Sequence, residues 1–456
     1  MSAAAPGRPP RPGNRALQRV LFISGSGASA TLRYRVRLPE EALRSRGVAT
    51  RAVHYTDPVA ARLADTADVV VLYRVPAGAE LLGLLADLRR RQTPPLVTYD
   101  VDDLVFRAEH LSSMTFLGGF SAPDRQRFAA DVELRGQLAG QADLLTASTA
   151  EVLAELATGH PAPAALLPNG AGLVGVRLAE SAVRVPRPTG RLRVGYFAGS
   201  ATHDADWSSI EPVVLEFLGS HPRAQLVLVG QVTPSSRVGA LPSGQLQVLD
   251  AVPWRELPAL LRTVDVNLAP LERAPFTEAK SAIKWLEAAL VETVTIGTGT
   301  GPFTAAVDDG RTGVLASTAQ EWAEALDRLA ADPAGRAEMG AAARVSALAM
   351  FGPSVQAERL VTVLTAALAT LDAGPGSYPP PPRAPAAWRR WPVLLERYPW
   401  PDTVAGCELA LPGPVRARDD ALRAVRLGRR AQAKAVRTAK RGILRVLRGQ
   451  PDADGG

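Results

Sequence analysis

The sequence predicts an α/β protein with two doubly wound domains that face each other across a cleft, followed by a basic helical tail. Short apolar runs rich in β-branched residues alternate with amphipathic helical patterns from residue 19 onward, which is typical of parallel α/β layers. The alternation stops near residue 172 and starts again near residue 191. In addition, 456 residues are too many for one ordinary core, and 46% hydrophobic with 21% charged residues is the balance of a folded protein.

The first domain is expected to cover residues 19–172. Its predicted strands are residues 20–24, 69–73, 96–99 and 144–147, and its predicted helices are residues 38–46, 81–91 and 152–157. Residues 1–18 begin with a run rich in Ala, Pro, Gly and Arg and lack the continuous apolar segment of a secretory signal. We therefore expect residues 1–18 to be a disordered lead-in.

A second domain is expected over residues 191–372, after a linker at residues 173–190 that shows little periodicity. Its predicted strands are residues 192–197, 226–229, 264–268 and 293–296. Its predicted helices are residues 208–218, 279–291, 319–330 and 355–371, the first of which begins at the capping-box sequence Ser208-Ser-Ile-Glu211. Ligands of doubly wound sheets bind at the carboxyl ends of the strands, so we expect the site in the cleft between the domains.

The end of the chain differs in composition from both domains. A Pro- and Trp-rich linker is expected over residues 373–415 and a basic amphipathic helix over residues 416–456. Residues 416–448 hold twelve Lys or Arg and two Asp, a local charge of +10, so residues 1–415 carry about −1 of the net +7. Because the folded body is nearly neutral, we expect no nucleic-acid partner. The basic residues recur every three or four positions in one stripe, which suits an anionic membrane surface; a solvated or partner-bound helix is the alternative.

The single cysteine, Cys407, excludes an internal disulfide and fits a reducing compartment. No run of 18 or more apolar residues occurs in the sequence. We therefore expect a cytoplasmic protein, peripheral to the inner face of the membrane if the basic helix binds lipid.

Several segments together resemble family 4 of the glycosyltransferases, whose close relatives are the glycosyl transferases group 1. They are residues 145–149, 168–170, 194–200, 279–287, 301–303 and 309–315. The resemblance covers residues 19–371 and implies the GT-B fold of two Rossmann-like domains. It also implies a retaining, metal-independent hexosyltransferase of polysaccharide biosynthesis that needs no cofactor. The nucleotide-sugar would be a substrate, and the acceptor a glycan, a lipid-linked glycan or a protein. Two departures stand out: Ala279 replaces the first Glu of the family's pair, and Ser200-Ala-Thr-His-Asp204 replaces its basic pair.

Donor-binding residues are expected after strand ends of the second domain. Lys280, Lys284 and Glu287 are spaced to share one face of a helix that starts near Ala279. The lysines would neutralise diphosphate charge, and the resemblance implies that Glu287 accepts hydrogen bonds from ribose hydroxyls. Without the resemblance, such a face is usually only solvated. The other expected donor contacts are Gly199, Ser200, Thr202, Ser281, Gly301, Pro302 and Phe303.

The most distinctive motif of the first domain is Tyr99-Asp-Val-Asp-Asp103. Alone, Asp100 and Asp102 resemble the metal-binding triplet of GT-A glycosyltransferases. The doubly wound repeat favours an acceptor-side role instead, and no metal is expected. Asp100 would bind a sugar hydroxyl or act as a catalytic base, with Asp102 and Asp103 as acceptor contacts. A helix N-cap and turn is the structural alternative.

Arg33, Tyr34 and Arg35 follow the first strand and are the remaining expected acceptor contacts, since arginines suit an anionic acceptor. Exposed arginines with no ligand explain the same residues equally well. His203, in the loop after residues 192–197, is the second catalytic candidate, although a lone loop histidine is more often structural.

Two other functions fit the sequence. A sugar-nucleotide epimerase would keep the fold and need no acceptor. A catalytically degenerate scaffold would keep the fold and use the basic tail to tether an assembly, and Ala279 in place of Glu favours it.

Overall fold

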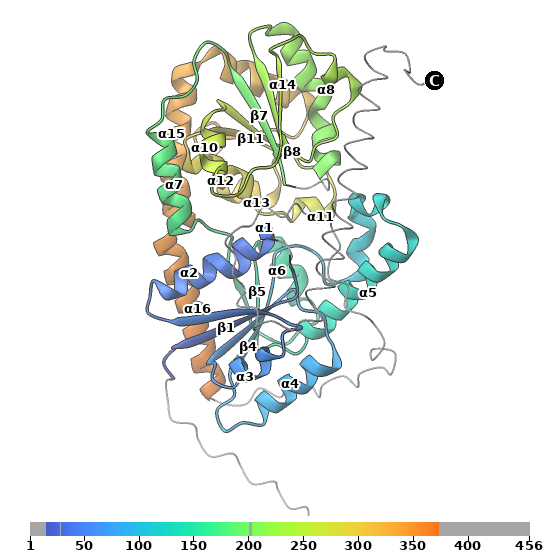
Figure 1. Cartoon of the computed structure of the whole chain (residues 1–456), viewed down its shortest axis with the longest axis vertical. Coiled ribbons are helices and arrows are strands. Elements are labelled where there is room, and N and C mark those ends of the chain that lie inside the picture. Colours follow the sequence, from blue (N-terminus) through green and yellow to red (C-terminus); the bar gives the residue numbers. More distant parts are fainter. Residues whose placement is uncertain (1–14, 28, 200–202, 374–456) are drawn as a thin grey trace, which may run out of the picture. The chain divides into compact units, whose positions relative to one another are not determined.

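The computed structural model describes residues 15–27, 29–199 and 203–373. Within them the chain forms two six-stranded parallel sheets with flanking helices, so the predicted fold class is confirmed (Figure 1). Ser200, Thr202, residues 374–415 of the Pro- and Trp-rich segment and the basic tail 416–456 lie outside the described residues. None of the described helices is long and apolar enough to span a membrane.

The first sheet has the order β2-β1-β3-β4-β5-β6. Its strands are β1 (Arg19–Ser24), β2 (Ala49–His54), β3 (Val69–Tyr73), β4 (Leu96–Val101), β5 (Leu144–Ala147) and β6 (Ala164–Leu166). Its helices are α1 (Ser29–Leu32), the π-helical turn η1 (Arg33–Arg37), α2 (Leu38–Arg44), α3 (Val59–Ala64), α4 (Ala79–Arg89), the 3-10 turns η2 (Ala108–Ser113) and η3 (Thr115–Gly119), α5 (Ala122–Ala139) and α6 (Ala150–Ala157). Alternate residues of β1 enter two apolar clusters, Leu21 in one and Phe22 in the other, because helices cover both faces of the sheet.

The second sheet has the order β12-β11-β10-β7-β8-β9. Its strands are β7 (Arg193–Ala198), β8 (Gln225–Gly230), β9 (Leu246–Leu249), β10 (Val266–Ala269), β11 (Val294–Gly297) and β12 (Val314–Leu315). The helices are α8 (Asp204–Ser220), α9 (Ser236–Gly239), α10 (Leu257–Arg262), α11 (Pro275–Glu278), α12 (Ile283–Leu290), α13 (Gly301–Ala306), α14 (Ala319–Ala331) and α15 (Pro333–Phe351). Trp207 of α8 and Trp285 of α12 are fully buried against this sheet and its neighbours.

The strand order of each sheet reverses beside its first strand. β1 lies between β2 and β3, and β7 lies between β10 and β8. At such a switch point the loops after adjacent strands run in opposite directions and leave a crevice at the carboxyl ends. This topology places η1 after β1, His203 after β7, and the segment from Pro275 to Leu290 after β10.

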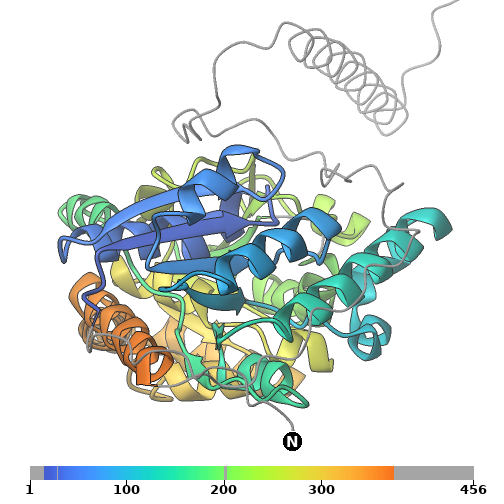
Figure 2. The same cartoon turned by 90° about the horizontal axis from the view of Figure 1, so that it is seen from below.

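Three predictions about the segments outside the sheets need correction. The linker expected at residues 173–190 is largely the helix α7 (Leu173–Val183), which packs against α10. The last helix, α16 (Pro353–Ala373), follows the second domain in sequence but packs against α2 and β4 of the first (Figure 2). Arg15 lies within the expected lead-in, yet it pairs with Asp372 of α16 at 3.1 Å.

Two predicted helices begin at other residues. α8 starts at Asp204 rather than Ser208, because Glu211 does not cap the helix: its carboxylate accepts hydrogen bonds from Trp207 Nε1 at 2.5 Å and from the Ser235 amide at 3.0 Å. The single helix expected over residues 279–291 is two helices, α11 and α12, separated by residues 279–282. The prediction that Lys280 shares a helix face with Lys284 is therefore wrong.

Candidate active site

The candidate donor residues gather around the segment between α11 and α12. Lys280 and Ser281 lie in the connection, whereas Lys284 and Glu287 lie one turn apart on α12. α12 is anchored by Trp285, whose Nε1 donates to the Thr312 carbonyl at 2.8 Å, and by the buried Leu286. Because one face of α12 is fixed in the core, the other face must carry the polar side chains toward the crevice.

Two lysines make this region electropositive. The ammonium of Lys284 is buried and has no hydrogen-bond partner among the residues that the structure describes. It lies 4.7 Å from the ring centre of Tyr196, on β7. Burial, reinforced by Lys280, lowers the pKa of Lys284 to about 8. The ammonium of Lys280 lies 5.3 Å from the ring centre of Phe276. A cation held against an aromatic face without a carboxylate can still bind an anion.

His203 is held by a carboxylate from its own helix. Its Nδ1 lies 2.8 Å from Asp206 Oδ2, while the other oxygen of Asp206 accepts from the Glu272 amide at 2.9 Å. Burial, together with Lys284, lowers the pKa of His203 to about 4, so the imidazole is neutral at pH 7. The pKa of Asp206 is raised by burial but lowered more by His203 and Lys280. Because an ionised carboxylate only accepts, His203 Nδ1 carries the hydrogen and Nε2 is left as an acceptor.

Residues of η1 contact the second domain rather than open solvent. The Tyr34 hydroxyl donates to Glu287 Oε1, and burial raises the pKa of both groups. The guanidinium carbon of Arg33 lies 3.8 Å from the ring centre of Trp254. π-Helical turns occur often at functional sites because they alter the directions of neighbouring side chains. Arg33 and Tyr34, two of the five expected acceptor residues, thus lie against residues of the second domain.

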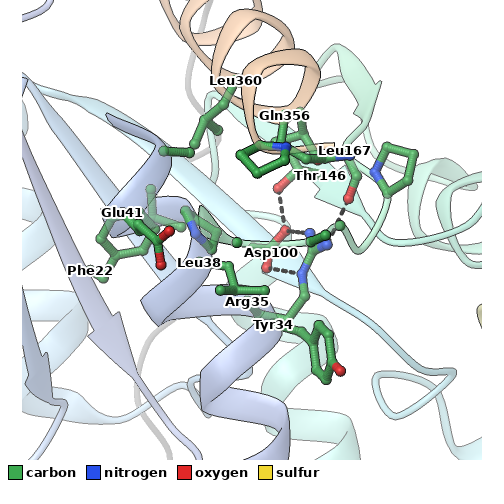
Figure 3. Close-up of a pocket in the computed structure, with 18 of the residues that line it drawn as sticks. Phe22, Tyr34, Arg35, Leu38, Glu41, Asp100, Thr146, Leu167, Gln356 and Leu360 are labelled. Atoms are coloured by element: carbon green, nitrogen blue, oxygen red, sulfur yellow. Dashed lines mark hydrogen bonds and ion pairs between the residues drawn. The ribbon is translucent and has the colours of Figure 1, made fainter. Parts of the chain in front are cut away.

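Arg35 and Asp100 form a buried pair instead of an exposed acceptor site (Figure 3). Their exposed fractions are 4% and 3%. Arg35 Nε donates to Asp100 Oδ2 at 2.9 Å, its Nη2 donates to the other oxygen, and Thr146 donates to Asp100 Oδ1 at 2.6 Å. The pair borders a largely apolar cavity of about 60 Å³ between α2, α16 and the sheet. A carboxylate so enclosed and paired is poorly placed to act as a base.

Asp102 and Asp103 are both paired with Arg74. Arg74 Nε donates to Asp102 at 2.5 Å, and its Nη2 donates to Asp103. Tyr73 also donates to Asp102 at 2.9 Å, and burial raises the pKa of Asp102. All three carboxylates of the motif at residues 100–103 thus form ion pairs with arginines, which gives them a structural role.

The remaining predicted contacts lie at strand ends of the second sheet. Gly199, which follows β7, is exposed, and a side chain there would meet no described atom. Gly301, Pro302 and Phe303 form the first turn of α13 rather than a free loop, and Phe303 is buried. A Cβ on Gly301 would collide with Glu151 of α6, so α13 lies directly against the first domain.

Sequence reasoning missed Asp206, Tyr196, Trp254 and Asn169. Asp206 lies three residues after His203, and that spacing was the available signal. Tyr196 is central in β7 and has the pattern of an ordinary core residue, whereas Asn169 lies in the resembling segment 168–170 with no role assigned to it. Their partners come from distant segments, so no local pattern identifies them.

Comparisons with known proteins agree with this fold. Residues 207–332, which include the α11–α12 segment, match the family model described as Glycosyl transferases group 1. The resemblance predicted from the sequence is therefore confirmed. A search of curated proteins finds no match to the sequence.

Solved structures similar to the chain share its two-domain architecture. Sucrose-phosphate synthase from Thermosynechococcus elongatus is 16% identical, with 77% of this chain and 100% of that chain covered and a TM-score of 0.54. The UDP-forming α,α-trehalose-phosphate synthase from Burkholderia vietnamiensis is 14% identical, with coverage of 77% and 99% and a TM-score of 0.53. HepE from Anabaena, solved with UDP and glucose, is 15% identical, with coverage of 76% and 100% and a TM-score of 0.50. At these identities the similarity establishes the GT-B fold.

Proposed function

We propose that this chain is a glycosyltransferase that moves a sugar from a nucleotide-sugar to a hydroxyl-bearing acceptor. The observation that carries the proposal is the pair Lys280 and Lys284. Neither makes an ion pair with a carboxylate among the described residues, and the Lys284 ammonium is buried without a hydrogen-bond partner there. Such a cation is costly unless an anion completes the site. A diphosphate supplies that anion.

The neighbouring groups suit the rest of a nucleotide-sugar. Glu287 lies one turn beyond Lys284 on α12, where its carboxylate can accept hydrogen bonds from ribose hydroxyls. Among the described residues no atom lies near the Cβ position of Gly199, which would leave room for the diphosphate, and Ser200 and Thr202 follow it in sequence. The first turn of α13, from Gly301 to Phe303, would face the transferred sugar. HepE was solved with UDP and glucose, which makes a UDP-sugar the first donor to test.

In the transfer step, the bond between the sugar C1 and the diphosphate oxygen breaks, and its electron pair leaves on the diphosphate. The acceptor oxygen forms the new bond to C1, and its proton passes to the departing diphosphate oxygen. Lys280 and Lys284 would neutralise the growing charge of the leaving group without a metal ion. Neutral His203, with Nε2 as acceptor, would bind a hydroxyl of the sugar or the acceptor. We propose a hexosyl group and a retaining outcome, as the resemblance implies.

The acceptor would approach from the first domain, but not through the residues expected from the sequence. Arg35, Asp100, Asp102 and Asp103 are engaged in ion pairs. Arg33 and Tyr34 contact the second domain, so a glycan, lipid-linked or protein acceptor would bind the crevice beyond them. We also propose that residues 416–448 bind an anionic membrane surface, which would give the protein a peripheral location. Residues 1–372 should then bind anionic liposomes more weakly than the full chain, and equal binding would contradict this role.

The test combines donor screening with one variant. UDP-, GDP-, TDP- and ADP-sugars are compared by thermal shift, since a ligand of the folded state raises apparent stability. Glu287→Ala should abolish donor hydrolysis and transfer while the fold persists. Glu324→Ala is the matched control, because Glu324 is exposed on α14, where its carboxylate accepts a hydrogen bond from Gln320. Unchanged turnover of Glu287→Ala would overturn the assignment. Donor consumption without an acceptor would favour an epimerase, and nucleotide binding without any turnover would favour a scaffold.

A further inference from the structure

A chain of hydrogen bonds runs from the buried ion pair of the first domain to the donor segment of the second. Arg35, held by both oxygens of Asp100, donates through Nη1 to the Leu167 carbonyl at 2.6 Å and to Asn169 Oδ1 at 3.2 Å. Asn169 Nδ2 then donates to Ser281 Oγ at 3.0 Å. Figure 3 shows the Arg35–Asp100 pair at the start of this chain.

The direction of each hydrogen bond in this chain is fixed by chemistry. A guanidinium has donors only, so the amide atom that faces Arg35 must be the oxygen of Asn169. The amide nitrogen of Asn169 must then face Ser281. Asn169 is 8% exposed and Arg35 is 4% exposed, so solvent cannot easily replace either partner. The orientation of the Asn169 amide with its oxygen toward Arg35 is therefore much more favourable than the flipped orientation.

This direction determines what the Ser281 hydroxyl can do. Its oxygen already accepts a hydrogen bond from Asn169, so its own hydrogen is directed elsewhere. Ser281 lies beside Lys280 in the connection between α11 and α12. The hydroxyl thus presents a donor to the same region as the two lysines.

We propose that Asn169 is a positioning residue that directs the Ser281 hydroxyl toward an anionic oxygen of the donor diphosphate. The proposal rests on the proposed function, because it assigns one more group to the diphosphate of that donor. Asp100 and Arg35 fix the Asn169 amide rather than contact the acceptor. The donor site then takes one of its determinants from the first domain, through a hydrogen bond that crosses between the domains.

The Thr149 hydroxyl supports the same connection from a second point. It donates to the Ala279 carbonyl at 2.9 Å, two residues before Ser281. The connection between α11 and α12 is therefore held to the first domain at both Ala279 and Ser281. A ligand that needs the Ser281 hydroxyl at a fixed position needs both contacts.

The experiment measures affinity for a nucleoside diphosphate and for its parent nucleoside by calorimetry, with UDP and uridine as the first pair, then GDP, TDP and ADP. Ser281→Ala and Asn169→Ala should each weaken UDP binding roughly tenfold or more, the usual loss for a hydrogen bond to a charged group. Uridine binding should stay unchanged, because uridine lacks the diphosphate. Ser281→Thr, which keeps a hydroxyl, should restore UDP binding. Asn169→Asp should bind UDP more weakly than Asn169→Ala, since a carboxylate turns the serine hydrogen toward itself.

The double variant and a control decide between positioning and general damage. In the Ser281→Ala background, Asn169→Ala should cost no further affinity, because the two residues act through one hydroxyl. Gln245→Ala is the matched control: Gln245 is buried and donates to three carbonyls at the far end of α8, so it should lose stability but keep its UDP affinity. Equal losses for UDP and uridine, or full losses for both substitutions in the double variant, would overturn the proposal. If the unaltered protein binds no nucleotide, the proposed function fails with it; if it binds and these variants bind equally well, only this inference fails.

Discussion

Lys284 is expected to stabilise the bound donor at the expense of the free protein. Its ammonium is buried against the Tyr196 ring with no hydrogen-bond partner among the described residues. Replacing it by methionine keeps the length of the side chain and removes the charge. We therefore predict that Lys284→Met makes the free protein more stable at pH 7 and abolishes donor binding.

The size of the effect follows from the pKa of Lys284. Burial lowers that pKa from 10.5 to about 8, and each pKa unit corresponds to about 1.4 kcal/mol. Keeping Lys284 charged in its buried site therefore costs the folded protein on the order of 3 kcal/mol. Because Lys284→Met also loses the contact with the Tyr196 ring, its net gain in unfolding free energy should be about 1–2 kcal/mol. The sign depends on pH. Between pH 8 and 10.5 the unfolded chain binds more protons than the folded chain, so stability rises with pH in that window. Below pH 8 the penalty is complete.

The assay is denaturant unfolding of the unaltered protein and the variant at pH 7 and pH 10. The advantage of Lys284→Met should be largest at pH 7 and shrink at pH 10, where Lys284 of the folded protein is already neutral. Lys280→Met serves as the control: it should also lose donor affinity, but it should gain no stability, because the Lys280 ammonium lies over Phe276 in the connection between helices. Destabilisation by Lys284→Met at pH 7, or an advantage independent of pH, would refute the reasoning.

The pH profile of kcat/KM should be bell-shaped. Protonation of His203 near pH 4 removes its acceptor nitrogen, and deprotonation of Lys284 near pH 8 removes the cation that binds the diphosphate. A kcat/KM that does not fall on the alkaline side would contradict the role of Lys284. Tyr34→Phe should tighten donor binding by up to about fivefold, since Glu287 no longer has to exchange the tyrosine hydroxyl for a ribose hydroxyl; weaker binding in calorimetry would mean that Tyr34 supports the site instead. A chelator should leave transfer unchanged, and restoration of lost activity by added Mg²⁺ would contradict metal-independent catalysis. Asp102→Asn should lower the free energy of unfolding by about 1 kcal/mol, because Arg74 loses one of its two carboxylate partners but keeps Asp103, while the affinity for donor stays the same.

The sequence was sufficient for the sheets because strand patterns are local. Residues 69–73 form a run of five apolar side chains, and they form the fully buried strand β3. Glu287 and Lys284 are one turn apart on a helix with a clear apolar face, and the structure keeps both on α12. Periodicity of this kind survives folding because it reflects which face each element buries.

The sequence was insufficient where a residue's role depends on distant partners. Residues 279–282 fit a helical pattern by periodicity, but contacts from Thr149 and Asn169 hold them as a connection between helices. Arg35 and Asp100 looked like ligand-binding residues because charged residues after buried strands usually face a crevice. Their mutual burial could not be seen without the path of the chain around them.

Both failures arise because the residues contact partners that lie far away in the sequence. Tyr34 and Asn169 belong to the first domain, yet each contacts a residue that we assign to the donor, Glu287 and Ser281. A donor site made only by the second domain would need no such contacts, and its determinants would all be readable within residues 191–372. Because two residues of the proposed donor site contact the first domain, we expect donor affinity to depend on how closely the two domains approach.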